Sequence, residues 1–103
     1  MKKVLLNPKP LTCAAPTVLV GTMVDGKPNF MAVAWCGVVN SNPPMISVSI
    51  RPSRYTFKGI QTKEFSVNIP STDIVKETDF CGIVSGAKID KTSVCKFDIF
   101  MAN

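Results

Sequence analysis

The dipeptide Asp25-Gly26 constrains the fold of this chain more than any other feature of its sequence. It separates two apolar stretches, Thr17–Val24 (TVLVGTMV) and Asn29–Gly37 (NFMAVAWCG). Asp-Gly tolerates the positive φ angles of a tight hairpin turn, and β-branched residues in the flanking stretches favour strands. The sequence therefore predicts an antiparallel hairpin whose strands are apolar on both faces, as in a barrel wall or a sheet buried on both sides.

Short elements follow this hairpin. Alternating residues predict a strand over Met45–Ile50, with Ile46, Val48 and Ile50 on one face, and a strand over Glu64–Ile69, with Phe65, Val67 and Ile69 facing inward. Loops are expected at Ser41–Pro44 and Ser85–Lys91, helices over about Arg54–Thr62 (capped by Ser53) and Asp73–Phe80 (capped by Ser71 or Thr72), and a weak strand over Ser93–Phe100. The 103 residues fit one domain spanning 1–103, a mainly β antiparallel barrel or sandwich with short peripheral helices.

Composition excludes several kinds of site. The chain has no histidine, which removes Ser-His-Asp and Cys-His nucleophiles and histidine metal sites. Its cysteines, Cys13, Cys36, Cys81 and Cys95, form no CxxC pair, so we expect no metal site or disulfide and expect small core residues instead. Any enzyme built on this chain relies on other side chains or on a cofactor.

The N-terminus indicates the cellular location of the protein, and the net charge indicates which ligands it favours. The apolar run Val4–Leu6 is too short for a signal peptide and is followed by Pro8 and Pro10, so we expect a cytoplasmic protein. No apolar run is long enough to cross a bilayer. The net charge of +5 favours anionic ligands, although the lysines and arginines are spread along the chain.

The segment Ser47–Thr56 (SVSIRPSRYT) is a candidate phosphate site. Its hydroxyls lie at a predicted strand end, and Arg51 and Arg54 add forked cationic donors suited to phosphate. A helix beginning after Ser53 would add free N–H groups. Spacing alone leaves a solvated turn with two surface arginines equally open.

Two further segments are candidates for a ligand. The small residues of Asn29–Trp35 (NFMAVAW) would let a flat ligand lie against the backbone, although spacing favours a core position for Trp35. Asp79–Lys91 (DFCGIVSGAKIDK) offers a flexible turn at Ser85-Gly86 with lysines after it, which also fits an ordinary helix C-terminus.

The segments PTVLVGTMVDGKPNFMAVAWCG, NPPMISVSIRPSRYT, FSVNIP and DFCGIVSGAKIDK, in this order, resemble the flavin reductase-like family, which includes flavoredoxins. The resemblance covers about residues 8–91. It implies a Greek-key split barrel, FMN bound without a covalent link, and a homodimer with the flavin near the subunit interface. It also implies electron transfer between NADH, NADPH or a protein donor and flavin.

The resemblance also implies which residues touch the cofactor, and it assigns no catalytic side chain. Asn29, Ala32, Val33, Ala34 and Trp35 would lie beside the isoalloxazine ring. Ser47, Val48, Ser49, Ile50 and Arg51 would contact the ring edge or the ribityl chain, and Ser53, Arg54, Tyr55 and Thr56 the phosphate side. Ser85, Gly86 and Lys91 would lie at the outer edge of the cofactor or in the loop of the neighbouring subunit.

The chain departs from the family pattern in two places. Ala32 stands where many members have threonine, so one hydroxyl contact is missing. Relatives also continue with further strands, so we expect a barrel incomplete at its C-terminus. This shortness favours, as a second hypothesis, a flavin-binding module without turnover. A small basic β-barrel that binds nucleic acid is a third, and the aromatic residues form no stacking row to support it.

Overall fold

The computed structural model describes residues 1–9 and 15–101, so Pro10 and Cys13 lie outside the described residues. The strands are β1 (Val18–Val24), β2 (Lys27–Val33), β3 (Cys36–Ser41), β4 (Pro44–Val48) and β5 (Ser66–Asn68). The helices are α1 (Phe57–Ile60), a 3-10 turn η1 (Thr72–Ile74), α2 (Val75–Ile83) and α3 (Lys91–Cys95). Within the described ranges, no helix is both long enough and apolar enough to span a membrane.

The predicted Asp-Gly hairpin is confirmed. β1 and β2 pair antiparallel in one continuous register, from Val18 opposite Val33 to Val24 opposite Lys27. The turn between them holds Asp25 at φ 50° and Gly26 at φ 78°, the left-handed angles that this dipeptide was expected to supply. β2 ends at Val33, however, so the single strand predicted through Gly37 was too long.

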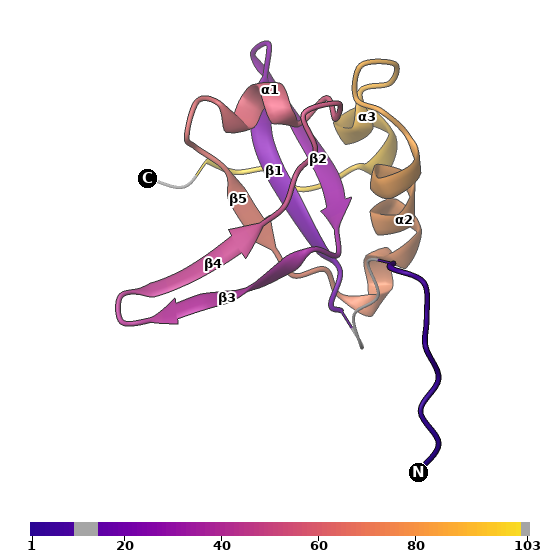
Figure 1. Cartoon of the computed structure of the whole chain (residues 1–103). Helices are drawn as coiled ribbons and strands as arrows, with labels where there is room; N and C mark the ends of the chain where they lie inside the picture. The colour runs from indigo at the N-terminus through magenta and orange to yellow at the C-terminus, as the bar shows by residue number, and fades with distance from the viewer. Residues whose placement is uncertain (10–14, 102–103) are drawn as a thin grey trace.

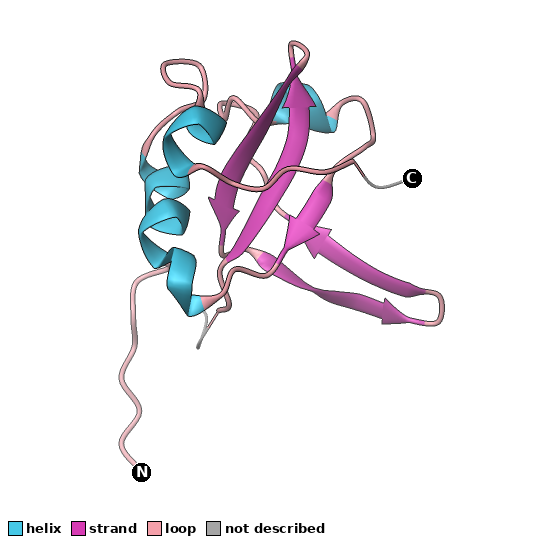
Figure 2. Cartoon of the chain, turned by 180° about the vertical axis from the view of Figure 1, so that it is seen from behind, coloured by secondary structure: helices cyan, strands magenta, loops and turns pink. Residues whose placement is uncertain are grey.

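A three-stranded sheet in the order β2-β1-β5 forms the body of the molecule (Figure 1). One face packs Val18, Val20 and Val33 against side chains from β5, α1 and the segment that contains β4. The other face packs Leu19 against Cys81 of α2 and Cys95 of α3. Figure 2 shows α2 and α3 together on this side of the sheet. The prediction that the hairpin is buried on both faces therefore holds for the body.

A second hairpin, which we call the arm, consists of β3 and β4 and projects from the body (Figure 1). Its strands are antiparallel, with a register shift between Val38 and Asn40. The predicted loop at Ser41–Pro44 is narrower in the structure, because the turn takes only residues 42–43 and both flanking residues belong to strands. Ile46, which was placed on the same face as Val48 and Ile50, has 54% of its surface exposed, while Val48 and Ile50 pack against the core.

Several other predicted elements need correction. α1 begins at Phe57 rather than after Ser53 and has four residues, because Arg51–Thr56 form successive turns closed by backbone bonds such as Arg54 N–H to Arg51 O (2.9 Å). β5 has three residues, of which Val67 packs in the core while Phe65 and Ile69, on either side of the strand, are exposed. α2 starts at Val75, after η1.

The strand predicted over Ser93–Phe100 is wrong, since α3 occupies Lys91–Cys95. The Asp90 carboxylate accepts a hydrogen bond from the Thr92 N–H (3.1 Å), and this capping bond begins the helix. The remaining features match the predicted class, a mainly β chain with short peripheral helices. Its two sheets do not close into a barrel within the described residues.

Candidate cofactor site

A buried hydrogen bond joins two of the predicted site segments. The Asn29 amide of β2 donates to the Thr56 hydroxyl across 2.8 Å, and both side chains are buried. Thr56 is held there by the turns that precede α1. The bond links residues 27 positions apart, so it fixes the candidate phosphate turn against the end of β2 next to the Asp-Gly turn.

The loop after α2 brings the third predicted segment to the same place. A Cβ atom added to Gly86 would overlap the Asn29 carboxamide and would lie 2.9 Å from the Tyr55 ring. Only glycine therefore fits at this contact. The loop folds back on itself through bonds from the Lys88 and Ile89 N–H groups to the Ser85 carbonyl, at 3.0 and 3.2 Å. Asn29, Tyr55–Thr56 and Ser85–Gly86 thus converge at this end of β2.

A polar hollow of about 280 Å³ opens beside this junction. It is lined by Val24, Lys27, Pro28, Asn29, Tyr55, Gly86, Ala87, Lys88, Ile89, Asp90 and Lys91. Three lysines outnumber its one carboxylate. Asp90 also accepts hydrogen bonds from both the N–H and the hydroxyl of Thr92, and the hydroxyl bond is the main reason that its pKa lies below the usual value. The hollow therefore suits an anionic group.

Lys91 lies deeper than the cofactor's outer edge, where the resemblance put it. Its side chain is 4% exposed, and its ammonium donates to the carbonyls of Phe30 (2.8 Å) and Cys81 (2.9 Å). Burial lowers its pKa, and the positive charge of Arg54 acts in the same direction. Lys91 thus ties β2 to α2 while contributing charge to one wall of the hollow.

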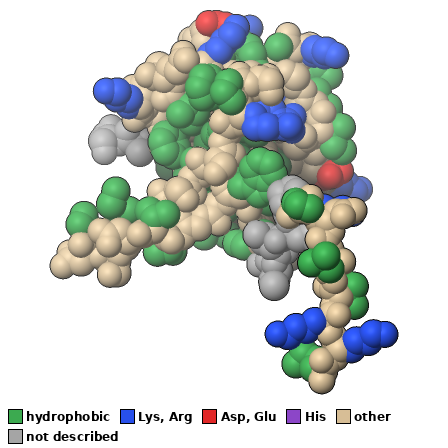
Figure 3. Space-filling view, in the orientation of Figure 1, with side chains coloured by type: hydrophobic (Ala, Val, Ile, Leu, Met, Phe, Trp, Pro, Cys, Tyr) green, Lys and Arg blue, Asp and Glu red, His purple; other side chains and the backbone are tan. Residues whose placement is uncertain are grey.

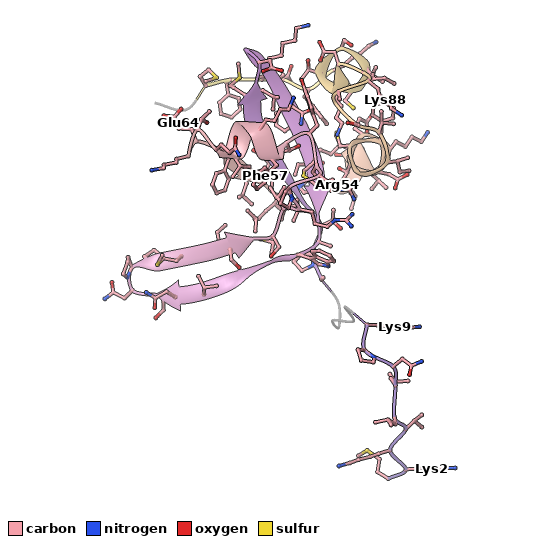
Figure 4. The ribbon with its side chains drawn as sticks, turned by 45° about the horizontal axis from the view of Figure 1, so that its top comes forward. Lys2, Lys9, Arg54, Phe57, Glu64 and Lys88 are labelled. Atoms are coloured by element: carbon pink, nitrogen blue, oxygen red, sulfur yellow. The ribbon has the colours of Figure 1, made fainter. Side chains whose placement is uncertain are left out.

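The predicted phosphate turn presents its cations to solvent. Arg51, Ser53 and Arg54 are exposed, whereas Thr56 is buried. In Figure 4, Arg54 lies nearer the arm and Lys88 nearer the helices α2 and α3. Because α1 starts at Phe57 and has only four residues, the helix N-terminus expected after Ser53 does not support this turn. Any anion held here depends on the arginines and hydroxyls themselves.

Of the residues predicted to lie beside the ring, Asn29 borders the polar hollow, whereas Ala32, Val33, Ala34 and Trp35 lie at and just beyond the opposite end of β2. Ala32 and Ala34 line a second hollow of about 610 Å³ against α2, together with Thr17, Pro70, Ser71, Thr72, Val75, Thr78, Asp79, Gly82 and Ile83. Trp35 is 49% exposed, so the core position favoured by spacing is wrong for it. Val33 is buried in the core with Val18 and Val20.

The four residues before Arg51 alternate between the core and the surface. Val48 and Ile50 pack against the core, while Ser47 and Ser49 are exposed. The Ser49 N–H donates to the Trp35 carbonyl (2.9 Å), which places Ser49 beside the segment Ala32–Trp35 that was predicted to contact the ring. Only the serines and Arg51 of this stretch have side chains that a ligand reaches from solvent.

Lys27 and Asp90 line the polar hollow without having been singled out in the sequence. The position of Lys27 directly after the Asp-Gly turn was the available signal, because the turn brings it to the same end of β2 as Asn29. For Asp90 the signal was its place before Lys-Thr-Ser, a pattern typical of a helix cap.

The two hollows differ in chemistry. Cationic and polar groups line the hollow beside Asn29, and the hollow at the other end of β2 includes the small residues Ala32, Ala34 and Gly82. At about 3.3 Å per residue, Asn29 and Val33 lie roughly 13 Å apart along β2. The chain therefore presents the two kinds of residue that a mononucleotide with a planar ring needs, cations for the phosphate and small side chains for the ring.

Comparison with known proteins agrees with this fit. The sequence model of the flavin reductase like domain matches residues 11–98. The crystal structure of flavoredoxin from Methanosarcina acetivorans superposes with a TM-score of 0.91 at 42% identity, covering 99% of this chain and 54% of that one. Flavoredoxin of Desulfovibrio vulgaris (Miyazaki F) gives 0.84 at 41% identity, covering 93% and 53%.

A third structure is described as an FMN-binding domain of a flavin reductases-like enzyme, from Shewanella baltica. It matches with a TM-score of 0.78 at 28% identity, over 86% of this chain and 48% of that one. The chain spans about half of each of these structures, and it covers 42% and 41% of the length of two curated relatives. The split-barrel fold predicted from the motifs is thus confirmed, and the chain belongs to the flavin reductase-like family.

Proposed function

We propose that this chain binds FMN without a covalent link and is the FMN-binding part of an oxidoreductase of the flavin reductase or flavoredoxin type. Electrons would pass between NADH, NADPH or a protein donor and the flavin. The observation that carries the proposal is the convergence of Asn29, Thr56 and Gly86 at one end of β2, in a chain of this family. Flavoredoxins and an FMN-binding domain are among the similar structures.

The phosphate end of FMN would lie between the exposed turn and the polar hollow. Arg51 and Arg54 would donate charge-assisted hydrogen bonds, each worth about 1.5–3 kcal/mol. The Ser53 hydroxyl would add a neutral donor. Lys27 and Lys88, on the other wall, raise the local positive potential. Asn29 would act through Thr56, which it holds in place by hydrogen bonding.

The ring end would lie beside Ala32, Ala34 and Trp35, where small side chains leave backbone groups accessible to a flat ligand. Ser47 and Ser49 would provide hydroxyls near its edge. When bound, FMN supplies the redox chemistry, because its ring accepts hydride and stores the electrons. The protein would then orient the cofactor, anchor its phosphate and limit the access of water.

Titration of the purified chain with FMN, followed by the visible spectrum, tests the binding. We expect Arg54→Ala to weaken FMN at least tenfold and riboflavin, which lacks the phosphate, much less. Lys76→Ala, which removes an exposed cation on α2, is the matched control and should change neither affinity. Absence of micromolar FMN binding would refute the proposal, and equal weakening of both ligands would remove Arg54 from the phosphate site.

A flavin-binding module without turnover is the second candidate, favoured by the coverage of about half of the matched structures. Steady-state oxidation of NADH and of NADPH with free flavin as acceptor separates the two. Measurable turnover above that of free flavin supports the reductase. FMN binding without turnover supports the module.

We also propose that the protein is a homodimer in which the arm is part of the interface. The arm exposes Val38, Val39, Met45 and Ile46, with between 51% and 80% of each surface accessible. Figure 3 shows hydrophobic side chains gathered along it. Sedimentation or light scattering should give a dimer that Val38→Ser with Ile46→Ser converts to a monomer. A wild-type monomer would refute this assignment.

The expected cytoplasmic location stays a prediction.

A further inference from the structure

Two buried thiols, one from α2 and one from α3, belong to the same hydrophobic cluster. Cys81 is 2% exposed and Cys95 is 9% exposed, and both belong to the cluster beneath Leu19. The Cys95 Sγ lies 4.0 Å from the Glu77 carbonyl oxygen of α2. Helical side chains lean toward the N-terminus of their helix, so the Cys81 side chain covers the turn that contains Glu77. The two thiols therefore lie against the same turn of α2.

Cys36 provides an internal comparison, because it lies in the cluster on the opposite face of the sheet. The strands separate it from Cys81 and Cys95, so the fold singles out one thiol pair from the three described cysteines.

We propose that Cys81 and Cys95 are a redox-sensitive pair that closes to a disulfide when the folded protein meets a hydroperoxide. Cys95 is the more exposed, so its sulfur reacts first. It attacks the peroxide, forming an S–O bond as the O–O bond breaks, which yields a sulfenic acid and one water from hydrogen peroxide. The Cys81 sulfur then displaces the hydroxyl group, forming the S–S bond and releasing a second water. The dithiol loses two electrons and two protons, and the peroxide is reduced to two waters.

The surroundings of Cys81 suit it to the second step. Burial, and then the neighbouring Cys95, raise its pKa to about 12, so Cys81 stays a thiol and is a poor primary target for the oxidant. The Lys91 ammonium, bound to the Cys81 carbonyl, works against this shift and favours the thiolate as the bond forms. We therefore expect the disulfide to form in the folded protein faster than the sulfenic acid of Cys95 is oxidised further.

The disulfide would close a ring that contains the loop after α2. This ring carries Gly86 and Lys88, which form one wall of the polar hollow. Closing a loop of about 15 residues removes freedom from the unfolded chain, and we expect it to raise Tm by about 10 °C. Oxidation would thus fix the wall of the hollow without requiring any ligand.

The full chain carrying Cys13→Ala, treated with hydrogen peroxide, unfolded and alkylated with iodoacetamide, tests the proposal. We expect one alkylated cysteine instead of three, and a tryptic species linking residues 77–88 to residues 92–96 that dithiothreitol separates. Cys36→Ala in this background should keep the link and the rise in Tm. Cys81→Ala or Cys95→Ala should lose both.

Three results would overturn the pair. The first is a disulfide that includes Cys36. The second is sulfinic acid on Cys95 without a linked species, and the third is full alkylation of all three thiols at peroxide doses that oxidise glutathione in the same tube. None of these measurements depends on FMN, so the test stands or fails separately from the proposed function.

Discussion

The two hairpins of this protein are built from similar residues and end in opposite environments. Val20, in the centre of β1, has no exposed surface, whereas Val38, in β3 of the arm, is 80% exposed. Both hairpins are antiparallel and rich in β-branched residues. The difference lies in their neighbours. β1 pairs with β5 and packs against α1, α2 and α3, while no third strand among the described residues pairs with β3 or β4.

Covering elements, rather than strand composition, therefore decide which valines stabilise this fold. A buried methyl group contributes free energy because it leaves water and fills a packed space. The same group on the arm does neither in the isolated chain. Matched substitutions in the two hairpins turn this contrast into measurable differences.

Truncating a valine in each hairpin should give the largest difference. Val20→Ala leaves a cavity in the core and should lower the free energy of unfolding by about 2–3 kcal/mol. Val38→Ala should change the free energy of unfolding of the monomer by less than about 0.5 kcal/mol. Urea unfolding of both variants, at a protein concentration low enough to keep the chain monomeric, measures the effect. Equal losses would mean that the arm is covered even in the monomer.

Lys91 should matter nearly as much, because it holds the outer strand of the body. Lys91→Met keeps the bulk of the side chain but deprives the Phe30 and Cys81 carbonyls of their donor. We expect a loss of about 2 kcal/mol, since hydrogen bonds from charged groups are among the stronger ones. Lys88→Met, three residues earlier and exposed, should be near neutral by urea unfolding. Similar effects of both would show that Lys91 acts only through its charge.

The glycines of the two hairpins should differ by a smaller amount. Gly26 has φ 78°, so Gly26→Ala forces a side chain into the left-handed region and should cost about 1 kcal/mol, although space is available. Gly37, in the arm, also has open space but no positive φ, so Gly37→Ala should be neutral or slightly stabilising. Thermal unfolding resolves the pair. A larger loss at Gly37 would contradict the contrast between the hairpins.

The smallest expected effect is a dependence on pH that arises only in the body. Burial lowers the pKa of Lys91 from 10.5, so between the lowered pKa and 10.5 the unfolded chain binds more protons than the folded one. In that window the free energy of unfolding of the wild type should rise with pH relative to Lys91→Met. Cys81 is present in both proteins, so its direct titration largely cancels. A relative fall measured between pH 8 and 10 would reverse the assigned shift.

Local rules explain which elements could be predicted. The Asp-Gly turn fixed the first hairpin, because few other dipeptides accept positive φ twice in succession. The end of β2 could not be read, since the apolar run continues through Trp35 while the chain leaves the sheet at Ala34. An apolar run shows that residues favour a strand, but not which sheet the strand joins.

The same reasoning applies to the helices. α3 begins within a tail, Ser93–Phe100, that was predicted as a strand because its residues alternate weakly, and the capping carboxylate of Asp90 outweighed that pattern. Phe65 and Ile69 were expected to be buried, but β5 is an edge strand only three residues long, so only its central Val67 reaches the core.

The sequence indicated which segments form the candidate site, but not which of their side chains face a ligand and which pack in the core. Asn29, Thr56 and Gly86, each from a different candidate segment, meet in the structure. The sequence did not show that Val33, Val48 and Ile50 would be taken by the core, nor that the Lys91 ammonium would be shared by two carbonyls. Those outcomes depend on contacts between residues far apart in the chain.

The ammonium on the Phe30 carbonyl has a consequence for self-assembly. β2 is the outer strand of its sheet, and an outer strand can recruit a strand from another molecule and so begin an aggregate. The Lys91 ammonium already donates to the Phe30 carbonyl, one of the acceptors with which an added strand would pair. α2 also packs close to β2, where Gly82 approaches Ala32. These contacts disfavour fibre-like growth from the β2 edge of the sheet. The exposed apolar residues of the arm are then the surface on which the chain associates.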